Sequence, residues 1–113
     1  MATPSDLYSS LLAALNSARS IMLSPAWQAE LDKATPDVRV AAGQSAMDLQ
    51  GAILTLSNES LADIAAQMQK NETDLTSTTQ GLTQALKDIT KVQSILGSIS
   101  KAVAVLGKVV TLM

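Results

Sequence analysis

Histidine, cysteine and phenylalanine are absent from this 113-residue chain. Without His and Cys, the chain lacks the most frequent protein ligands of zinc and the side chain that transfers protons near neutral pH. The missing cysteines also exclude disulfides and thiol chemistry. We therefore expect no metal and no cofactor.

Aromatic residues are nearly absent too, since Trp27 and Tyr8 are the only ones. A core must then be built from Leu, Ile, Val, Met and Ala, which suits interdigitating helices better than a sheet. The composition predicts an all-α fold, and the length fits one domain over residues 1–113. Trp27, beside Pro25, fits a plug at the end of a helical bundle or an interface anchor.

No stretch of the sequence carries catalytic machinery. The five glycines are scattered, so none forms a phosphate-binding loop, and no serine has a histidine base. Carboxylates such as Glu72 and Asp74 are two residues apart and would point to different sides of a helix. The basic C-terminal region lacks Arg and interleaved aromatics, which argues against nucleic-acid binding. We expect a protein that is not an enzyme.

Three helices are predicted in the first half, over residues 5–23, 25–34 and 36–57. Ser5 is a candidate N-cap of the first. The other two begin with the same device, a capping Ser or Thr followed by a proline at the first helical position, at Pro25 and Pro36. Gly43 and Gly51 lower the helix propensity of the third helix, and we interpret them as places where another helix approaches closely.

From residue 60 onward, apolar residues recur at alternating steps of three and four up to the last residue. This heptad pattern predicts one long coiled-coil-like helix over 60–112 in an elongated hairpin or bundle. At about 1.5 Å per residue, such a helix would be a rod of roughly 80 Å. A break near residues 71–81, where Thr residues and Gly81 lower helix propensity, is the alternative.

Towards the C-terminus the apolar stripe widens, and the positions beside it become aliphatic. We name this predicted interaction surface the C-terminal seam; it consists of Leu82, Leu86, Ile89, Val92, Ile95, Leu96, Ile99, Val103, Leu106, Val109 and Val110. Four lysines, placed on the opposite face, are candidate lipid-facing charges: Lys87, Lys91, Lys101 and Lys108. Residues 87–113 carry a net charge of +3 (four lysines, one aspartate), in a chain of net charge −2.

Three interpretations of the seam remain open: a core helix, an interface with another chain, or a helix that lies on or enters a membrane. The function we expect is a structural or interaction protein that self-associates or packs with a helical partner through the seam. The alternative is a membrane-active, pore-forming or toxin-like protein that inserts its C-terminal helix into anionic lipid.

The first ten residues show no signal peptide, so we expect a protein that is cytoplasmic or exported without a cleaved signal. Its composition resembles that of bacterial secreted helical proteins.

Overall fold

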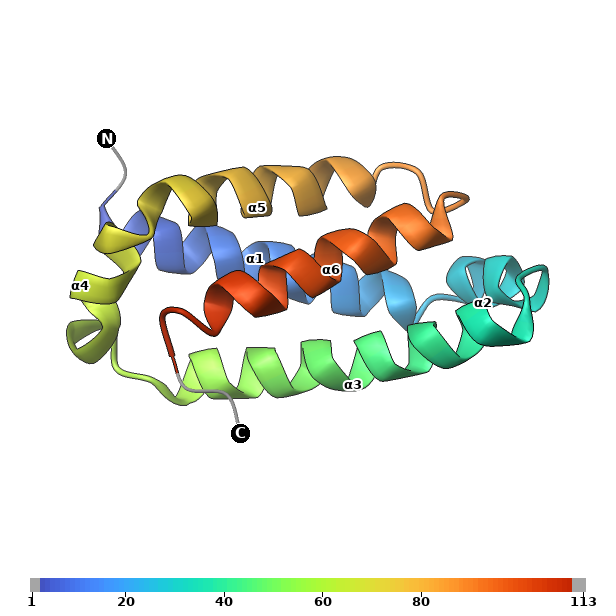
Figure 1. The fold of residues 1–113 in the computed structure, drawn as a ribbon, viewed down its shortest axis with the longest axis horizontal. Helices are drawn as coiled ribbons and strands as arrows, with labels where there is room; N and C mark the ends of the chain where they lie inside the picture. Colours follow the sequence, from blue (N-terminus) through green and yellow to red (C-terminus); the bar gives the residue numbers. More distant parts are fainter. Residues whose placement is uncertain (1–2, 111–113) are drawn as a thin grey trace.

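The computed structural model describes residues 3–110, and all regular structure in this range is helical (Figure 1). The all-α prediction is confirmed. There are six helices in the described range: α1 (Pro4–Met22), α2 (Pro25–Asp32), α3 (Pro36–Asn58), α4 (Leu61–Lys70), α5 (Glu72–Ala85) and α6 (Val92–Leu106).

The first three helices start in the same way, each with a capping hydroxyl before a proline. The caps are Thr3, Ser24 and Thr35, and each accepts a hydrogen bond from a backbone N–H of its first turn. Thr3 also forms a capping box with Asp6, so the first N-cap is Thr3 and the prediction of Ser5 was wrong. The pair Thr3–Pro4 starts α1 in the same way as Thr35–Pro36 starts α3.

Four long helices, α1, α3, α5 and α6, lie side by side, and the chain reverses direction between consecutive ones (Figure 1). In this bundle α1 contacts α3 and α5, and α6 contacts the same two helices from the other side. The short helices α2 and α4 close opposite ends of the bundle. Trp27 of α2 is buried in the core, which matches its predicted role as an end plug.

Apart from Trp27 and Met68 the core is aliphatic, and it contains no buried polar residue among those described. Helix α1 contributes one continuous stripe, including Leu7, Leu11 and Leu15, because positions three and four apart share a helix face. The phenol of Tyr8 donates a hydrogen bond of 3.1 Å to the carbonyl of Leu56 and joins α1 to the last turns of α3. The same carbonyl also accepts a 3.2 Å hydrogen bond from the backbone N–H of Glu59 at the end of α3, so the phenol is its second donor.

The single helix predicted over residues 60–112 is wrong, because this part of the chain forms α4, α5 and α6. The longest dimension of the molecule is 43 Å, which cannot contain a rod of roughly 80 Å. Helix α6 also ends at Leu106, after which Val109 and Val110 turn back into the core. Residues 111 and 112, predicted to be helical, lie outside the described residues.

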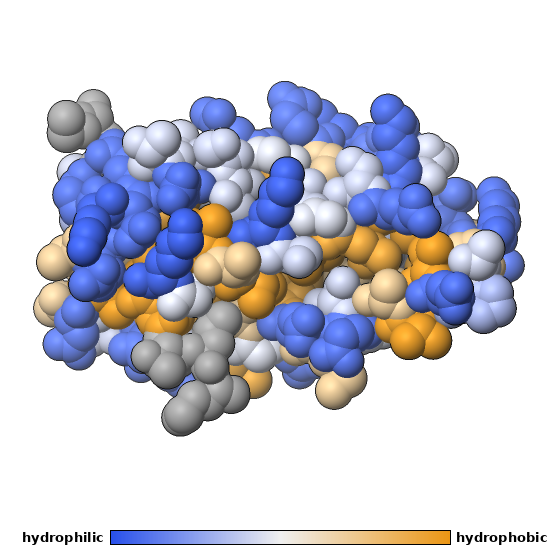
Figure 2. Space-filling model, viewed as in Figure 1, coloured by the Kyte–Doolittle hydropathy of each residue, from blue (hydrophilic) through white to orange (hydrophobic). Residues whose placement is uncertain are grey.

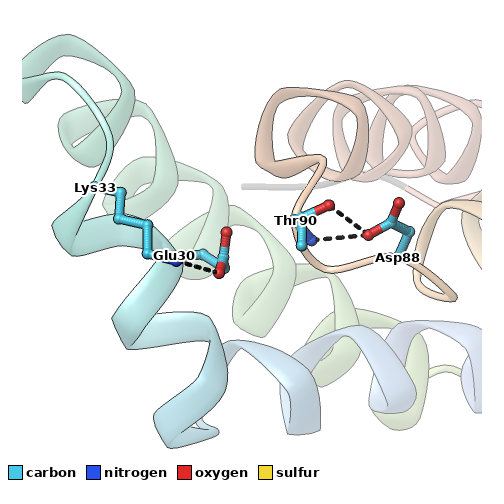
Figure 3. A network of polar contacts seen from close by, with 4 residues as sticks. All are labelled: Glu30, Lys33, Asp88 and Thr90. Carbon is cyan, nitrogen blue, oxygen red and sulfur yellow. Dashed lines mark hydrogen bonds and ion pairs between the residues drawn. The ribbon is translucent and has the colours of Figure 1, made fainter.

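The main break lies at residues 86–91 and not in the threonine-rich segment. There the Asp88 carboxylate accepts hydrogen bonds from both the backbone N–H and the hydroxyl of Thr90 (Figure 3). Asp and Thr side chains that bind nearby backbone groups compete with helical hydrogen bonding. The chain reverses here, and the two halves of the heptad pattern pack against each other as the antiparallel pair α5 and α6.

A second, smaller break lies at Asn71, between α4 and α5. Its φ and ψ angles of −105° and 20° leave the helical region, and its side-chain amide donates a 2.8 Å hydrogen bond to the carbonyl of Gln67. This break falls at the start of the alternative window, residues 71–81, whereas α5 continues through the threonines and Gly81.

Candidate interaction surfaces

The C-terminal seam faces the inside of this chain's own bundle. Seven of its residues are buried in the core: Leu82, Val92, Ile95, Ile99, Leu106, Val109 and Val110. The other four are half-buried and pack against that core: Leu86, Ile89, Leu96 and Val103. Burial of the seam therefore needs no second chain. A charged residue in place of Ile99 would disturb the fold of the monomer before it disturbed any interface between chains.

The half-buried part of the seam still leaves apolar surface accessible. Figure 2 shows a hydrophobic band along the face on which α6 lies, next to hydrophilic side chains. Between α3 and α6 this face has a shallow groove lined by Ser45, Asp48 and α6 residues such as Val103. Its volume of about 280 Å³ is below that of usual small-molecule sites. The groove is therefore better suited to one or two side chains than to a small-molecule ligand.

The four predicted lipid-facing lysines are all exposed. Lys108 forms an ion pair of 3.3 Å with Asp74 at the start of α5. Lys87, Lys91 and Lys101 form no salt bridge with any residue that the structure describes. A weak cationic surface therefore accompanies the α5–α6 turn and the outer side of α6.

A second apolar surface, which the sequence analysis did not identify, lies on α3. Val40, Met47 and Leu54 are 73%, 69% and 57% exposed, and they follow each other at seven-residue steps. They point away from the core. Buried Leu49 lies nine residues after Val40, which is about two and a half turns, so Leu49 is on the opposite side of the helix. We call the seven residues of this face the α3 outer stripe: Val40, Gly43, Gln44, Met47, Gln50, Gly51 and Leu54.

The two glycines of the α3 outer stripe are not explained by packing within the chain. A Cβ atom added at Gly43 or at Gly51 would have no heavy atom within 4 Å, and neither residue has a positive φ. We expected another helix to approach these glycines closely, but no helix among residues 3–110 does so. Alanine would fit both positions and favour the helix by up to about 1 kcal/mol each.

The acidic side chains of residues 3–110 form no candidate metal site, since no group of three or more of them is arranged to hold a metal ion. A larger surface groove lies where the α2–α3 turn meets the start of α6, with Glu30 and Lys33 on one side and Thr90 on the other (Figure 3). Glu30 and Lys33 pair with each other at 3.3 Å, and Lys91 also lines the groove.

The α3 outer stripe carried a signal that could have been detected in the sequence. One apolar set of this helix includes Leu49, Ile53 and Leu56, which are buried in the core. The same helix has a second heptad-spaced apolar set on the opposite side, and two apolar sets on one helix indicate two packing surfaces.

In comparisons with protein-family models, with curated proteins and with solved structures, no significant match to this chain was found.

Proposed function

We propose that this protein is a non-enzymatic interaction protein that acts by packing its helices against another chain, first of all against a second copy of itself. The observation that carries the proposal is the exposure of Val40, Met47 and Leu54 on one face of a helix whose opposite face is fully used by the core. Single exposed apolar residues are common on protein surfaces, but aligned ones at heptad spacing are typical of helix-packing sites.

The C-terminal seam has a different part in this proposal from the one we first expected. Its buried residues hold α6 against α3 and α5. Its half-buried residue Val103 lines the groove beside α3 and would extend a contact made there. A partner helix would then contact mainly α3, and α6 would lie at the edge of the contact.

Molar mass in solution tests the proposal. By sedimentation equilibrium, the wild-type mass should rise above 11.8 kDa as the concentration increases. Met47→Glu should keep the mass at the monomer value, because a carboxylate in an apolar contact loses its hydration without a partner. The matched control is Leu23→Glu, which places the same charge at a 75% exposed apolar residue outside α3 and should associate like the wild type. A wild type that stays monomeric at hundreds of micromolar contradicts the proposal.

A membrane-active role is the second candidate, favoured by the hydrophobic band over α6 in Figure 2 together with exposed Lys87, Lys91 and Lys101. No helix within residues 3–110 has the length and apolarity needed to cross a bilayer. The candidate mode is therefore binding at an anionic surface, with each lysine contributing about 1 kcal/mol near the headgroups. Cosedimentation with anionic vesicles should occur at low salt and decline with salt. Absence of binding by folded protein at low salt argues against this role.

A further inference from the structure

The α3 outer stripe has the same sequence of residue types in both directions around Met47. Gln44 and Gln50 lie three residues on either side of it, Gly43 and Gly51 lie four residues away, and Val40 and Leu54 lie seven residues away. All of these residues are exposed. The core of the chain does not require this symmetry, because it contacts only the opposite side of α3.

Such a pattern is complementary to itself when two copies of the helix pack antiparallel about a two-fold axis. A two-fold interface places each residue against its mirror position in the partner. With the axis at Met47, the two Met47 side chains meet, Gly43 faces Gly51, and Val40 faces Leu54. Large residues then meet at the centre and ends, and the glycines bring the two backbones close together in between.

The charges of α3 agree with a contact between like surfaces. Asp48 is the only charged residue between Arg39 and Glu59, and it lies at the flank of the stripe, about 100° from Met47 around the helix. No charged residue would have to be buried, and no like charges would meet at the centre of the interface. The glutamines can hydrogen-bond to each other across the axis, since an amide both donates and accepts.

The size of the surface sets the strength of the contact. Helix α3 has 23 residues, so it is about 35 Å long and, at a width of about 10 Å, offers a footprint of roughly 350 Å² per chain. A standard stable interface needs about 800 Å² per partner. The contact is therefore that of a weak dimer that forms and dissociates readily.

From these observations we infer that two copies of this chain form a weak antiparallel dimer through the α3 outer stripe, with Met47 on the two-fold axis. This inference rests on the proposed function and adds the surface, the orientation and the register to it.

Engineered cysteines test the arrangement directly, because the natural chain has none. Helix axes 8–10 Å apart place facing Cα atoms about 3.4–5.4 Å apart, and the upper part of this range can be joined by a disulfide. Met47→Cys should therefore cross-link with itself under mild oxidation. Val40→Cys should not, because the two copies of residue 40 would be about 21 Å apart along the helices. A mixture of Val40→Cys and Leu54→Cys should cross-link, since these positions face each other.

The control for random collision is Leu23→Cys, at an exposed residue outside the stripe. Met47→Cys and the mixed pair should form disulfide dimers at least about tenfold faster than this control, because a formed dimer holds the two thiols together. Circular dichroism of each variant verifies that the fold is kept.

The dimer is overturned if Met47→Cys reacts no faster than Leu23→Cys, and the antiparallel register is overturned if Val40→Cys cross-links with itself. If either occurs while the wild-type mass still rises with concentration, the proposed function stands and only this inference fails. A monomeric wild type contradicts both.

Discussion

Truncation of Ile99 to alanine separates burial of the C-terminal seam within one chain from burial between chains. Ile99 is 1% exposed and lies in the middle of α6, among core residues of its own bundle. In this structure its environment is complete in the monomer. Ile99→Ala should therefore destabilise the monomer itself.

The size of the effect follows from the burial. Removing the outer methyl and methylene groups loses about 0.8 kcal/mol for each buried carbon, and the cavity left behind adds to this loss. The expected total is about 2–5 kcal/mol of unfolding free energy. For a domain of this size, the melting temperature should fall by roughly 8–20 °C. Val40→Ala, at a 73% exposed position, is the matched control and should change stability by less than about 0.5 kcal/mol.

The assay is thermal unfolding followed by circular dichroism at low micromolar concentration, where a weak dimer has dissociated. Sedimentation equilibrium of the same variants supplies the molar mass. If Ile99→Ala lowered the molar mass but left the dilute melting temperature unchanged, the seam would be an interface between chains, and the packing of α6 described here would be refuted.

Three further predictions concern single features of the bundle. Gly43→Ala combined with Gly51→Ala should raise the unfolding free energy of the dilute monomer by about 0.5–1 kcal/mol per site and should weaken association. A double variant that associates as well as the wild type would show that no helix approaches these glycines. Tyr8→Phe should cost about 0.5–1.5 kcal/mol in a denaturant titration, because it removes the hydrogen bond to the Leu56 carbonyl; an unchanged midpoint would contradict the role of that bond. Hydrogen bonds from the side chain and then the backbone of Thr90 lower the pKa of Asp88 in the folded protein below its ordinary value of 3.8. The stability that Asp88 contributes is therefore present above pH 3.8 and is lost as the pH falls through the lower pKa of the folded state. Asp88→Asn should therefore reduce the loss of stability on acidification, measured from about pH 5 to pH 2, and an unchanged acid dependence would show that the turn does not contribute.

Local signals in the sequence were sufficient for the three helices before residue 60 but not for the three helices after it. Pro25 and Pro36 marked two helix starts correctly, because proline after a capping hydroxyl acts through local geometry alone. The heptad pattern predicted which residues are buried, but a rod that pairs with another chain and a hairpin that folds back bury the same stripe. The turn over residues 86–91 contains neither Gly nor Pro, so the usual markers of a reversal were missing.

The candidate surface was harder to predict than the fold. Periodicity identifies apolar faces but does not tell which of two faces on α3 meets the core, since this depends on how many neighbours the bundle supplies. In the structure, α1 and α6 both cover the Leu49 side of α3, and no described helix covers the Met47 side. The glycines at 43 and 51 indicated a close helix contact, but only the structure shows that no helix of residues 3–110 makes this contact.

The most direct measurement is a dilution series of amide spectra recorded by NMR on isotopically labelled protein. If α6 belongs to the monomer core and α3 carries the interface, dilution should shift the amide signals of the α3 outer stripe, with the largest changes near Gly43, Met47 and Gly51. The signals of Ile95 and Ile99 should stay in place. Shifts concentrated in α6, with those of α3 unchanged, would contradict the account.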